Sequence, residues 1–149
     1  MKQLRALLRS DRFREIFIYG IVGVLTTVIN YAVYFGASRG VAVLLGIAPT
    51  HAMIILIAKI IAWVAAVAFA YWANKVYVFR STDWSRGTLA REIPGFVSAR
   101  VLSLVIDAAI VELAVYLFDM NDLIATLISN VVVVVLNYFA SKFWIFRKR

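Results

Sequence analysis

The chain has 149 residues, of which 64% are apolar and only 16% are charged, whereas about 25% of residues are charged in an average soluble domain. A soluble domain of this length could not bury so much apolar surface, so the composition predicts a single membrane domain over residues 1–149 and disfavours a soluble enzyme. The absence of cysteine excludes a disulfide-linked secreted scaffold, and a net charge of +8 in so apolar a chain is typical of membrane orientation rather than nucleic-acid binding.

Charged residues divide the apolar sequence into four runs, each near or above the roughly 20 residues needed to cross a bilayer core. The sequence therefore predicts an all-α membrane protein with four transmembrane helices, over residues 15–38, 52–74, 93–118 and 123–146. The first run has a basic start, but it is longer than the apolar region of a signal peptide and no clear cleavage site follows it. We therefore expect it to be retained as a membrane span.

The basic residues predict the orientation of these spans. Thirteen of the sixteen Lys and Arg residues precede the first span, separate the second from the third, or follow the fourth. The two other connections hold Arg39 as their only basic residue, together with Asp119 and Asp122. By the positive-inside rule, both termini and the middle connection are expected in the cytoplasm.

The two halves of the chain resemble each other. Residues 72–80 read WANKVYVFR, and residues 139–147 read FASKFWIFR. The aligned pairs are Lys75 with Lys142 and Arg80 with Arg147, at an offset of 67 residues, and Asn30 with Asp107, at an offset of 77. We therefore predict two helical hairpins related as a parallel repeat, a pattern found in transporters.

Four ionisable residues, Lys59, Arg100, Asp107 and Glu112, fall inside the predicted spans. Each costs about 2.5–3.5 kcal/mol to insert at the centre of a membrane helix, so each needs a partner or a wet cavity. Arg100 and Asp107 lie on one face of the third span, and their cost favours a functional role for both. For Lys59 and Glu112, a structural pair and a role in transport are both open.

Neutral polar residues follow the spans at helical spacing and predict a polar interior. Any one of them is explained by hydrogen bonding between helices, which is worth about 0.6 kcal/mol in a membrane. Together they would also form a path for a polar head group. In the second span, alanines at every fourth residue predict close helix packing, within the subunit or between subunits.

Lys75, Arg80, Lys142 and Arg147 lie beside aromatic residues at the predicted inner interface. Ordinary anchoring of helix ends explains this pattern, and a basic pocket for phosphorylated lipid head groups explains it equally well. The sequence offers little for catalysis, because His51 is the only histidine and no Gly-rich phosphate loop is present. We expect no enzymatic activity, no metal and no cofactor.

Four motifs in chain order resemble the GtrA-like family. They are residues 23–31 (GVLTTVINY), 74–79 (NKVYVF), 98–107 (SARVLSLVID) and a block within 121–142 that includes Asn130, Asn137 and Lys142. The resemblance implies a four-helix protein of a bacterial or archaeal inner membrane. It also implies a flippase that moves a polyprenyl-phosphate-linked monosaccharide, often glucose, to the outer leaflet for cell-surface polysaccharide glycosylation. A polyprenyl-phosphate glycosyltransferase would be its partner.

On this interpretation, two sets of residues handle the lipid. The phosphate would be received by Lys75, Arg100 and Lys142 and attracted by Arg80 and Arg147. The sugar path would consist of Thr27, Asn30, Asn74, Asp107, Asn130 and Asn137.

Two other functions are open. A small multidrug exporter also has four helices, but it relies on an acidic residue in its first helix, where this chain has only Glu15 at the inner end. A membrane scaffold that recruits a glycosyltransferase would need no polar interior. The oligomeric state is open too, because a homo-oligomer would widen the thin wall of four helices, with Gly36 and Gly40 as one candidate contact.

Overall fold

The computed structural model of the chain describes residues 11–146, with side chains from residue 13 onward. Its helices are α2 (Asp11–Leu45), α3 (Ala52–Ala73), the π-helix η1 (Asn74–Val78), α4 (Arg86–Phe118), α5 (Asp122–Ala140) and the π-helix η2 (Ser141–Ile145). Within these residues there is no β-strand, and four helices are long and apolar enough to cross a membrane. The predicted all-α fold is confirmed, and the protein is a multi-pass membrane protein.

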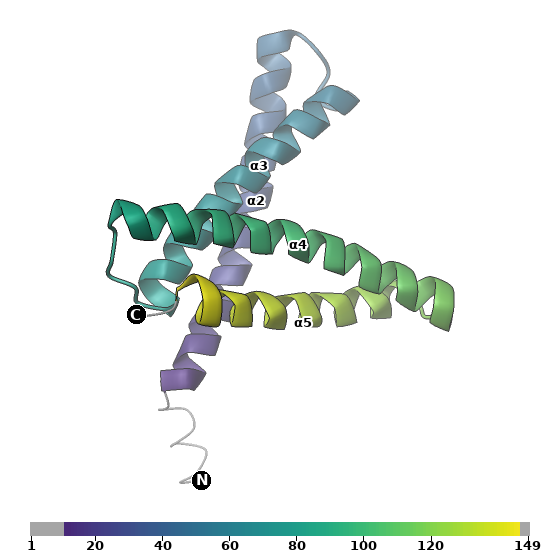
Figure 1. Cartoon of the computed structure of the whole chain (residues 1–149). Helices are drawn as coiled ribbons and strands as arrows, with labels where there is room; N and C mark the ends of the chain where they lie inside the picture. Colours follow the sequence, from purple (N-terminus) through teal and green to yellow (C-terminus); the bar gives the residue numbers. More distant parts are fainter. Residues whose placement is uncertain (1–10, 147–149) are drawn as a thin grey trace, which may run out of the picture. The chain divides into compact units, whose positions relative to one another are not determined.

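Each half of the chain folds as a helical hairpin (Figure 1). The first compact unit is Met1–Arg80, in which α2 packs against α3 and η1. The second unit is Ser81–Arg149, in which α4 packs against α5 and η2. The two hairpins expected from the internal repeat are therefore confirmed, and the cytoplasmic location of the termini stays a prediction.

The helices begin at capping residues rather than at the edges of the apolar runs. Ser85 precedes α4, and its Oγ accepts a hydrogen bond from the backbone N–H of Thr88 at 3.4 Å. The helix therefore starts seven residues before the predicted span over 93–118. With 35 residues, α2 is about 50 Å long at 1.5 Å per residue, so its ends extend past a hydrocarbon core of about 30 Å.

Small residues form the contact between the two helices of the first hairpin. The buried positions of α3 recur at every fourth residue from Ile54 to Ala70, and Ala73 follows three residues later. They are Ile54, Ala58, Ala62, Ala66, Ala70 and Ala73. Their short side chains let the backbones approach closely, which is how membrane helices gain packing energy. The alanine pattern thus packs within a hairpin. At equivalent positions of the repeat, α5 buries Ala125, Ser129 and Asn137, so the second hairpin has a more polar contact.

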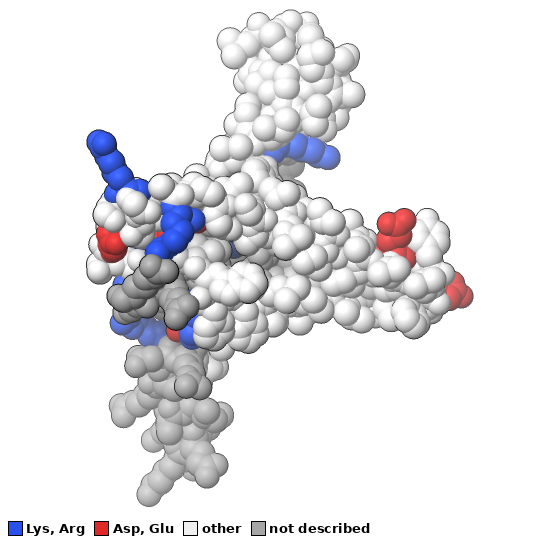
Figure 2. All heavy atoms as spheres, in the orientation of Figure 1, with Lys and Arg blue, Asp and Glu red and all other residues white. Residues whose placement is uncertain are grey.

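The outer surface of the helices is apolar. Large side chains such as Val43, Leu44 and Tyr116 are each at least 80% exposed. Figure 2 shows long stretches of each hairpin without charged side chains on the face that is drawn. A soluble protein rarely exposes so large a continuous apolar area, whereas lipid tails cover it in a membrane.

Candidate functional site

The two hairpins end in the same unusual backbone feature. The π-helices η1 and η2 begin at Asn74 and Ser141, which are equivalent positions of the repeat. The N–H of Phe79 donates to the Asn74 carbonyl, and the N–H of Phe146 donates to the Ser141 carbonyl, both at 2.9 Å. Short π-turns of this kind are often found at functional sites, so the ends of both hairpins are candidate site regions.

Each π-turn carries one of the lysines predicted to receive phosphate. Lys75 is fully buried, at 0% exposure. Lys142 is half-buried, and its Nζ donates a hydrogen bond of 2.9 Å to the hydroxyl of Tyr138 while lying 5.3 Å from the centre of that ring. The repeat thus places both lysines at the same backbone position, but in different surroundings.

Asn74, next to Lys75, has an unsatisfied acceptor. Its side chain is 1% exposed, and its Nδ2 donates to the Ala70 carbonyl at 2.7 Å. Its Oδ1 has no hydrogen-bond partner among the described residues. A buried oxygen left in this state costs about 1–3 kcal/mol, so Asn74 is suited to accept a hydrogen bond from a ligand hydroxyl.

The second hairpin holds two polar contacts between its helices. The hydroxyl of Ser103 on α4 lies 2.8 Å from Asn137 Oδ1 on α5 and 2.6 Å from the Ala99 carbonyl of its own helix, so its one proton is shared between the two acceptors. One turn further along α4, Asp107 Oδ1 accepts a hydrogen bond of 2.5 Å from the hydroxyl of Ser129 on α5. We call these four residues the polar seam. It contains two predicted path residues, Asp107 and Asn137, in two separate hydrogen-bonded pairs inside a membrane hairpin.

Among its described residues, the first hairpin has no counterpart to the polar seam. The equivalent positions of the repeat are Thr26, Asn30, Ala62 and Ala70. The two alanines have no polar side-chain atoms, so they cannot bond across the hairpin. Thr26 donates to the Val22 carbonyl of its own helix at 2.7 Å, as Ser103 does to the equivalent Ala99 carbonyl at 2.6 Å. The difference in polarity therefore comes from α5, where a serine and an asparagine replace two alanines of α3.

A groove of about 650 Å³ lies beside the polar seam. Ser98, Ser103, Asn137 and Arg91 supply its polar lining, and the aromatic rings of Phe139, Phe143 and Trp144 line it as well. Its volume is within the range of about 300–1,000 Å³ for small-molecule sites. Hydroxyl, amide and guanidinium groups beside an apolar wall match a polar head group on a lipid chain.

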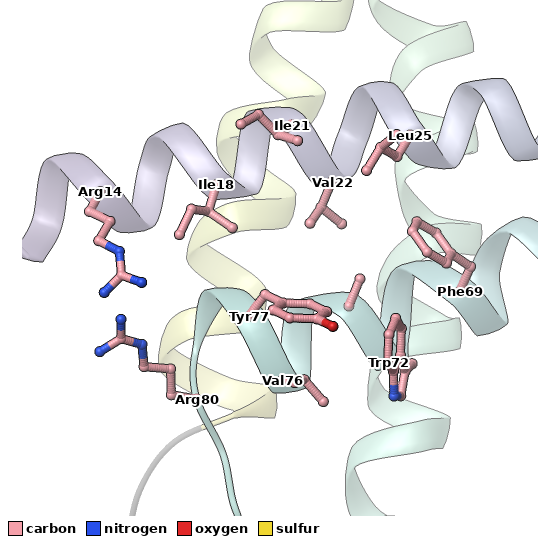
Figure 3. Close-up of a pocket in the computed structure, with 11 residues that line it drawn as sticks. Arg14, Ile18, Ile21, Val22, Leu25, Phe69, Trp72, Val76, Tyr77 and Arg80 are labelled. Atoms are coloured by element: carbon pink, nitrogen blue, oxygen red, sulfur yellow. The ribbon is translucent and has the colours of Figure 1, made fainter.

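A smaller groove of about 410 Å³ lies in the first hairpin (Figure 3). Its lining residues are equivalent to those of the second groove: Arg14 corresponds to Arg91, Leu25 to Leu102, Trp72 to Phe139 and Tyr77 to Trp144. Arg80, a predicted phosphate residue, lines this groove too. Apart from Arg14 and Arg80, its lining side chains are apolar or aromatic.

The other predicted site residues that the structure describes do not line either groove. The guanidinium of Arg100, which is half-buried, lies 5.0 Å from the ring centre of Phe96, a cation–π arrangement. Thr27 is exposed, and its hydroxyl donates to the Gly23 carbonyl of its own helix at 3.2 Å. Asn30 is half-buried and Asn130 is exposed. Arg147 lies outside the described residues.

The structure brings to these sites several residues that were not predicted as site residues, among them Ser103, Ser129, Arg14 and Arg91. Ser103 lies four residues before Asp107, and Ser129 lies eight residues before Asn137, so helical periodicity could have placed both on the faces of the predicted path residues. The offset of 77 residues aligns Arg14 with Arg91, but nothing in the sequence placed either arginine at a groove.

Comparisons with known proteins identify relatives over most of the chain. Residues 18–146 match the family model described as "GtrA/DPMS, transmembrane domain". An uncharacterized membrane protein, YwcD of Bacillus subtilis, is 37% identical over 130 residues, which cover 87% of this chain and 94% of YwcD. The cell wall teichoic acid glycosylation protein GtcA of Listeria monocytogenes is 36% identical over 138 residues, 93% of this chain and 88% of GtcA. GtcA of Listeria innocua is 34% identical over 140 residues, which cover 94% of this chain and 90% of that GtcA. No solved structure matches the chain.

Proposed function

Because the chain belongs to the GtrA/DPMS transmembrane-domain family, we propose that it acts in cell-surface glycosylation as a flippase in a bacterial plasma membrane. Its cargo is a polyprenyl-phosphate-linked monosaccharide, with glucose as the first candidate, and it moves from the cytoplasmic to the outer leaflet. The GtcA relatives, which are named for teichoic acid glycosylation, support the role in cell-surface glycosylation.

The polar seam is the observation that carries this proposal. Polar side chains inside a membrane hairpin are expensive unless they are satisfied, and here serine hydroxyls bond to Asn137 and Asp107. A sugar carries several hydroxyl groups that both donate and accept. It can exchange with such bonds one at a time, so the head group would cross the apolar core without losing all its hydrogen bonds at once.

The phosphate of the cargo needs cations as well as hydroxyl partners. Its diester carries one negative charge, which Lys75, Arg100 and Lys142 would neutralise in our proposal. Arg91 adds a guanidinium to the lining of the groove beside the seam. The polyprenyl chain would remain in the lipid, against the apolar outer surface of the helices.

A leaflet assay tests the proposal. Purified protein is placed in liposomes with a short-chain polyprenyl-phosphate-glucose, and the access of an external reagent to the sugar is followed over time. We expect protein-dependent equilibration, slowed by about tenfold in an Asn137→Leu variant that loses a buried hydrogen bond. Thr126→Val is the matched control, because Thr126 is exposed on the same helix. Equal rates for wild type and Asn137→Leu would reject the role of the seam.

The same assay separates a flippase from its alternatives. We propose that no covalent bond of the cargo changes, so the mass of the recovered lipid should equal that of the lipid supplied. A scaffold that only recruits a polyprenyl-phosphate glycosyltransferase would give no equilibration in liposomes. In cells, it would support normal surface glycosylation even with the polar seam replaced by apolar residues.

A further inference from the structure

We infer that the groove of the first hairpin is a separate binding site for a lipid phosphomonoester, the carrier lipid after its sugar has been transferred. Arg14 and Arg80 would hold the phosphate, and the wall formed by Phe69, Trp72 and Tyr77 would hold the chain. The inference rests on the proposed function for the source of this ligand.

The charge at the mouth of the groove points to a doubly charged anion. Figure 3 shows the guanidinium groups of Arg14 and Arg80 pointing toward one another at one end of the groove. Among the side chains that the structure describes, residues 13–146, no carboxylate lines the groove. Two cations that face each other repel, and a phosphomonoester with about −1.5 to −2 charge at pH 7 would neutralise both. A phosphodiester, with a single negative charge, would neutralise only one.

The backbone holds one of these arginines in a strained conformation. Arg80 has a φ of 48°, in the left-handed region that L-residues other than glycine rarely adopt. It directly follows η1 and Phe79, at the point where the hairpin ends. Helices commonly end with a left-handed residue, and Asp119 ends α4 with the same φ, so this conformation marks the end of the hairpin and sets where the Arg80 side chain leaves the backbone.

The wall of the groove is apolar and aromatic, which suits a hydrocarbon chain. The rings of Trp72 and Tyr77 meet edge to face with their centres 5.3 Å apart, and Phe69 lies 6.1 Å from Trp72. The equivalent groove of the second hairpin offers the polar side chains of two serines and an asparagine, whereas this one is apolar or aromatic apart from its two arginines. The repeat therefore gives two related grooves, one suited to the sugar-bearing lipid and one suited to the lipid without its sugar.

The chemistry of glycosylation supplies this ligand. Transfer of the sugar breaks the bond between its anomeric carbon and a phosphate oxygen, which keeps the electron pair. A new bond forms between that carbon and the acceptor's hydroxyl oxygen, and the hydroxyl proton goes to a base. The lipid is left as a phosphomonoester, which has to return to the cytoplasmic leaflet before it can be loaded again.

Binding of farnesyl monophosphate to the purified full chain in neutral detergent, measured by calorimetry, tests the inference. We expect Arg14→Gln and Arg80→Gly each to weaken binding by about tenfold or more, as expected for the loss of a charge-assisted hydrogen bond. Glycine at position 80 relieves the left-handed strain, so this variant removes the charge without endangering the fold. Arg80→Lys should keep part of the affinity. Arg39→Gln is the matched control, because Arg39 is exposed on the same helix as Arg14 and bonds only to Phe35.

Competition by other lipids completes the experiment. Phosphatidylglycerol and a farnesyl phosphoglucose, both diesters, should displace the monophosphate at least about tenfold less well. Wild-type affinity in both arginine variants, or equal competition by phosphatidylglycerol, would overturn the inference. The result is independent of the leaflet assay, so binding without flipping would reject the proposed function alone, and flipping without this binding would reject only the second site.

Discussion

Ser103 and Asn137 are hydrogen bonded between the two helices of the second hairpin, at 2.8 Å, whereas the first hairpin has Thr26 and Ala70 at the equivalent positions. Thr26 and Ser103 each donate to a carbonyl of their own helix, so the difference is that Ala70 has no polar side chain to face Thr26. The chain thus contains one hairpin held by small apolar residues and one held in part by polar side chains. These two kinds of contact predict different responses to mutation.

Removing the serine of this pair should destabilise the second hairpin. Ser103→Ala leaves the buried Asn137 without a partner on α4, at a cost of about 0.6 to 2 kcal/mol in a membrane protein. We expect a lower midpoint of thermal unfolding in detergent, followed by tryptophan fluorescence. Ser98→Ala provides the comparison, because Ser98 is exposed and should change the midpoint little. Equal midpoints for the two variants would contradict the structural role of the bond.

The first hairpin should be sensitive to side-chain volume instead. Ala62 is fully buried where α3 meets α2, at 0% exposure, so Ala62→Leu should cost about 1–3 kcal/mol through overpacking. Ala62→Ser, which copies the equivalent Ser129, should be tolerated. Ala68 is exposed on the same helix, and Ala68→Leu should unfold at the wild-type temperature. Unfolding of all three variants at one temperature would show that α3 does not pack through this face.

The helices and hairpins could be predicted from the sequence because each rests on a strong, repeated signal. An apolar run long enough to cross a bilayer has few alternatives to a membrane helix. The match between residues 72–80 and residues 139–147 is sufficient by itself to identify the repeat. Both segments lie at the end of a hairpin, where each contains a π-turn. The π-turns themselves were not predictable, because one shifted hydrogen bond leaves no mark in the residue pattern.

The candidate site was only partly predictable. Helical spacing identified Asp107 and Asn137, but it does not fix the rotation of one helix against its neighbour, on which a contact such as Ser103 to Asn137 depends. The same limit explains Thr27 and Asn130, which belong to polar stripes and yet are exposed. A stripe shows which residues share a face, whereas the partner of that face is decided by packing.

The orientation of the hairpins is testable because the chain contains no cysteine. Single cysteines at Thr82, between α3 and α4, and at Thr50, between α2 and α3, lie in exposed connections. The positive-inside rule predicts that a membrane-impermeant thiol reagent added to intact cells labels the Thr50→Cys variant and spares Thr82→Cys. Labelling of both after permeabilisation is the control. Labelling at position 82 in intact cells would reverse the topology.

Sugar transfer and flipping should depend on both the charge and the planar shape of the Arg100 side chain. The guanidinium stacks 5.0 Å from the ring centre of Phe96, a side chain that is 1% exposed and therefore rigid. Arg100→Ala should abolish sugar transfer in cells while the protein is expressed normally. Arg100→Lys keeps the charge and loses the flat contact, which is worth about 0.5–2 kcal/mol, so we expect a partial loss of flipping in liposomes. If Arg100→Ala transfers sugar like the wild type, Arg100 does not receive the phosphate.

Asn74 offers the sharpest separation of function from stability. Its Oδ1 is buried without a partner among the described residues, at a cost of about 1–3 kcal/mol, which its bond to the Ala70 carbonyl partly offsets. Asn74→Leu, of similar size, removes both the cost and the bond, so the free energy of unfolding should change by less than about 1 kcal/mol. Flipping should nevertheless fall, because the acceptor for the sugar is gone. A residue needed only for the fold would show the reverse, with lowered stability and unchanged flipping by the molecules that remain folded. Measuring unfolding and flipping on the same preparation therefore decides why the chain keeps an unsatisfied amide at the start of a π-turn.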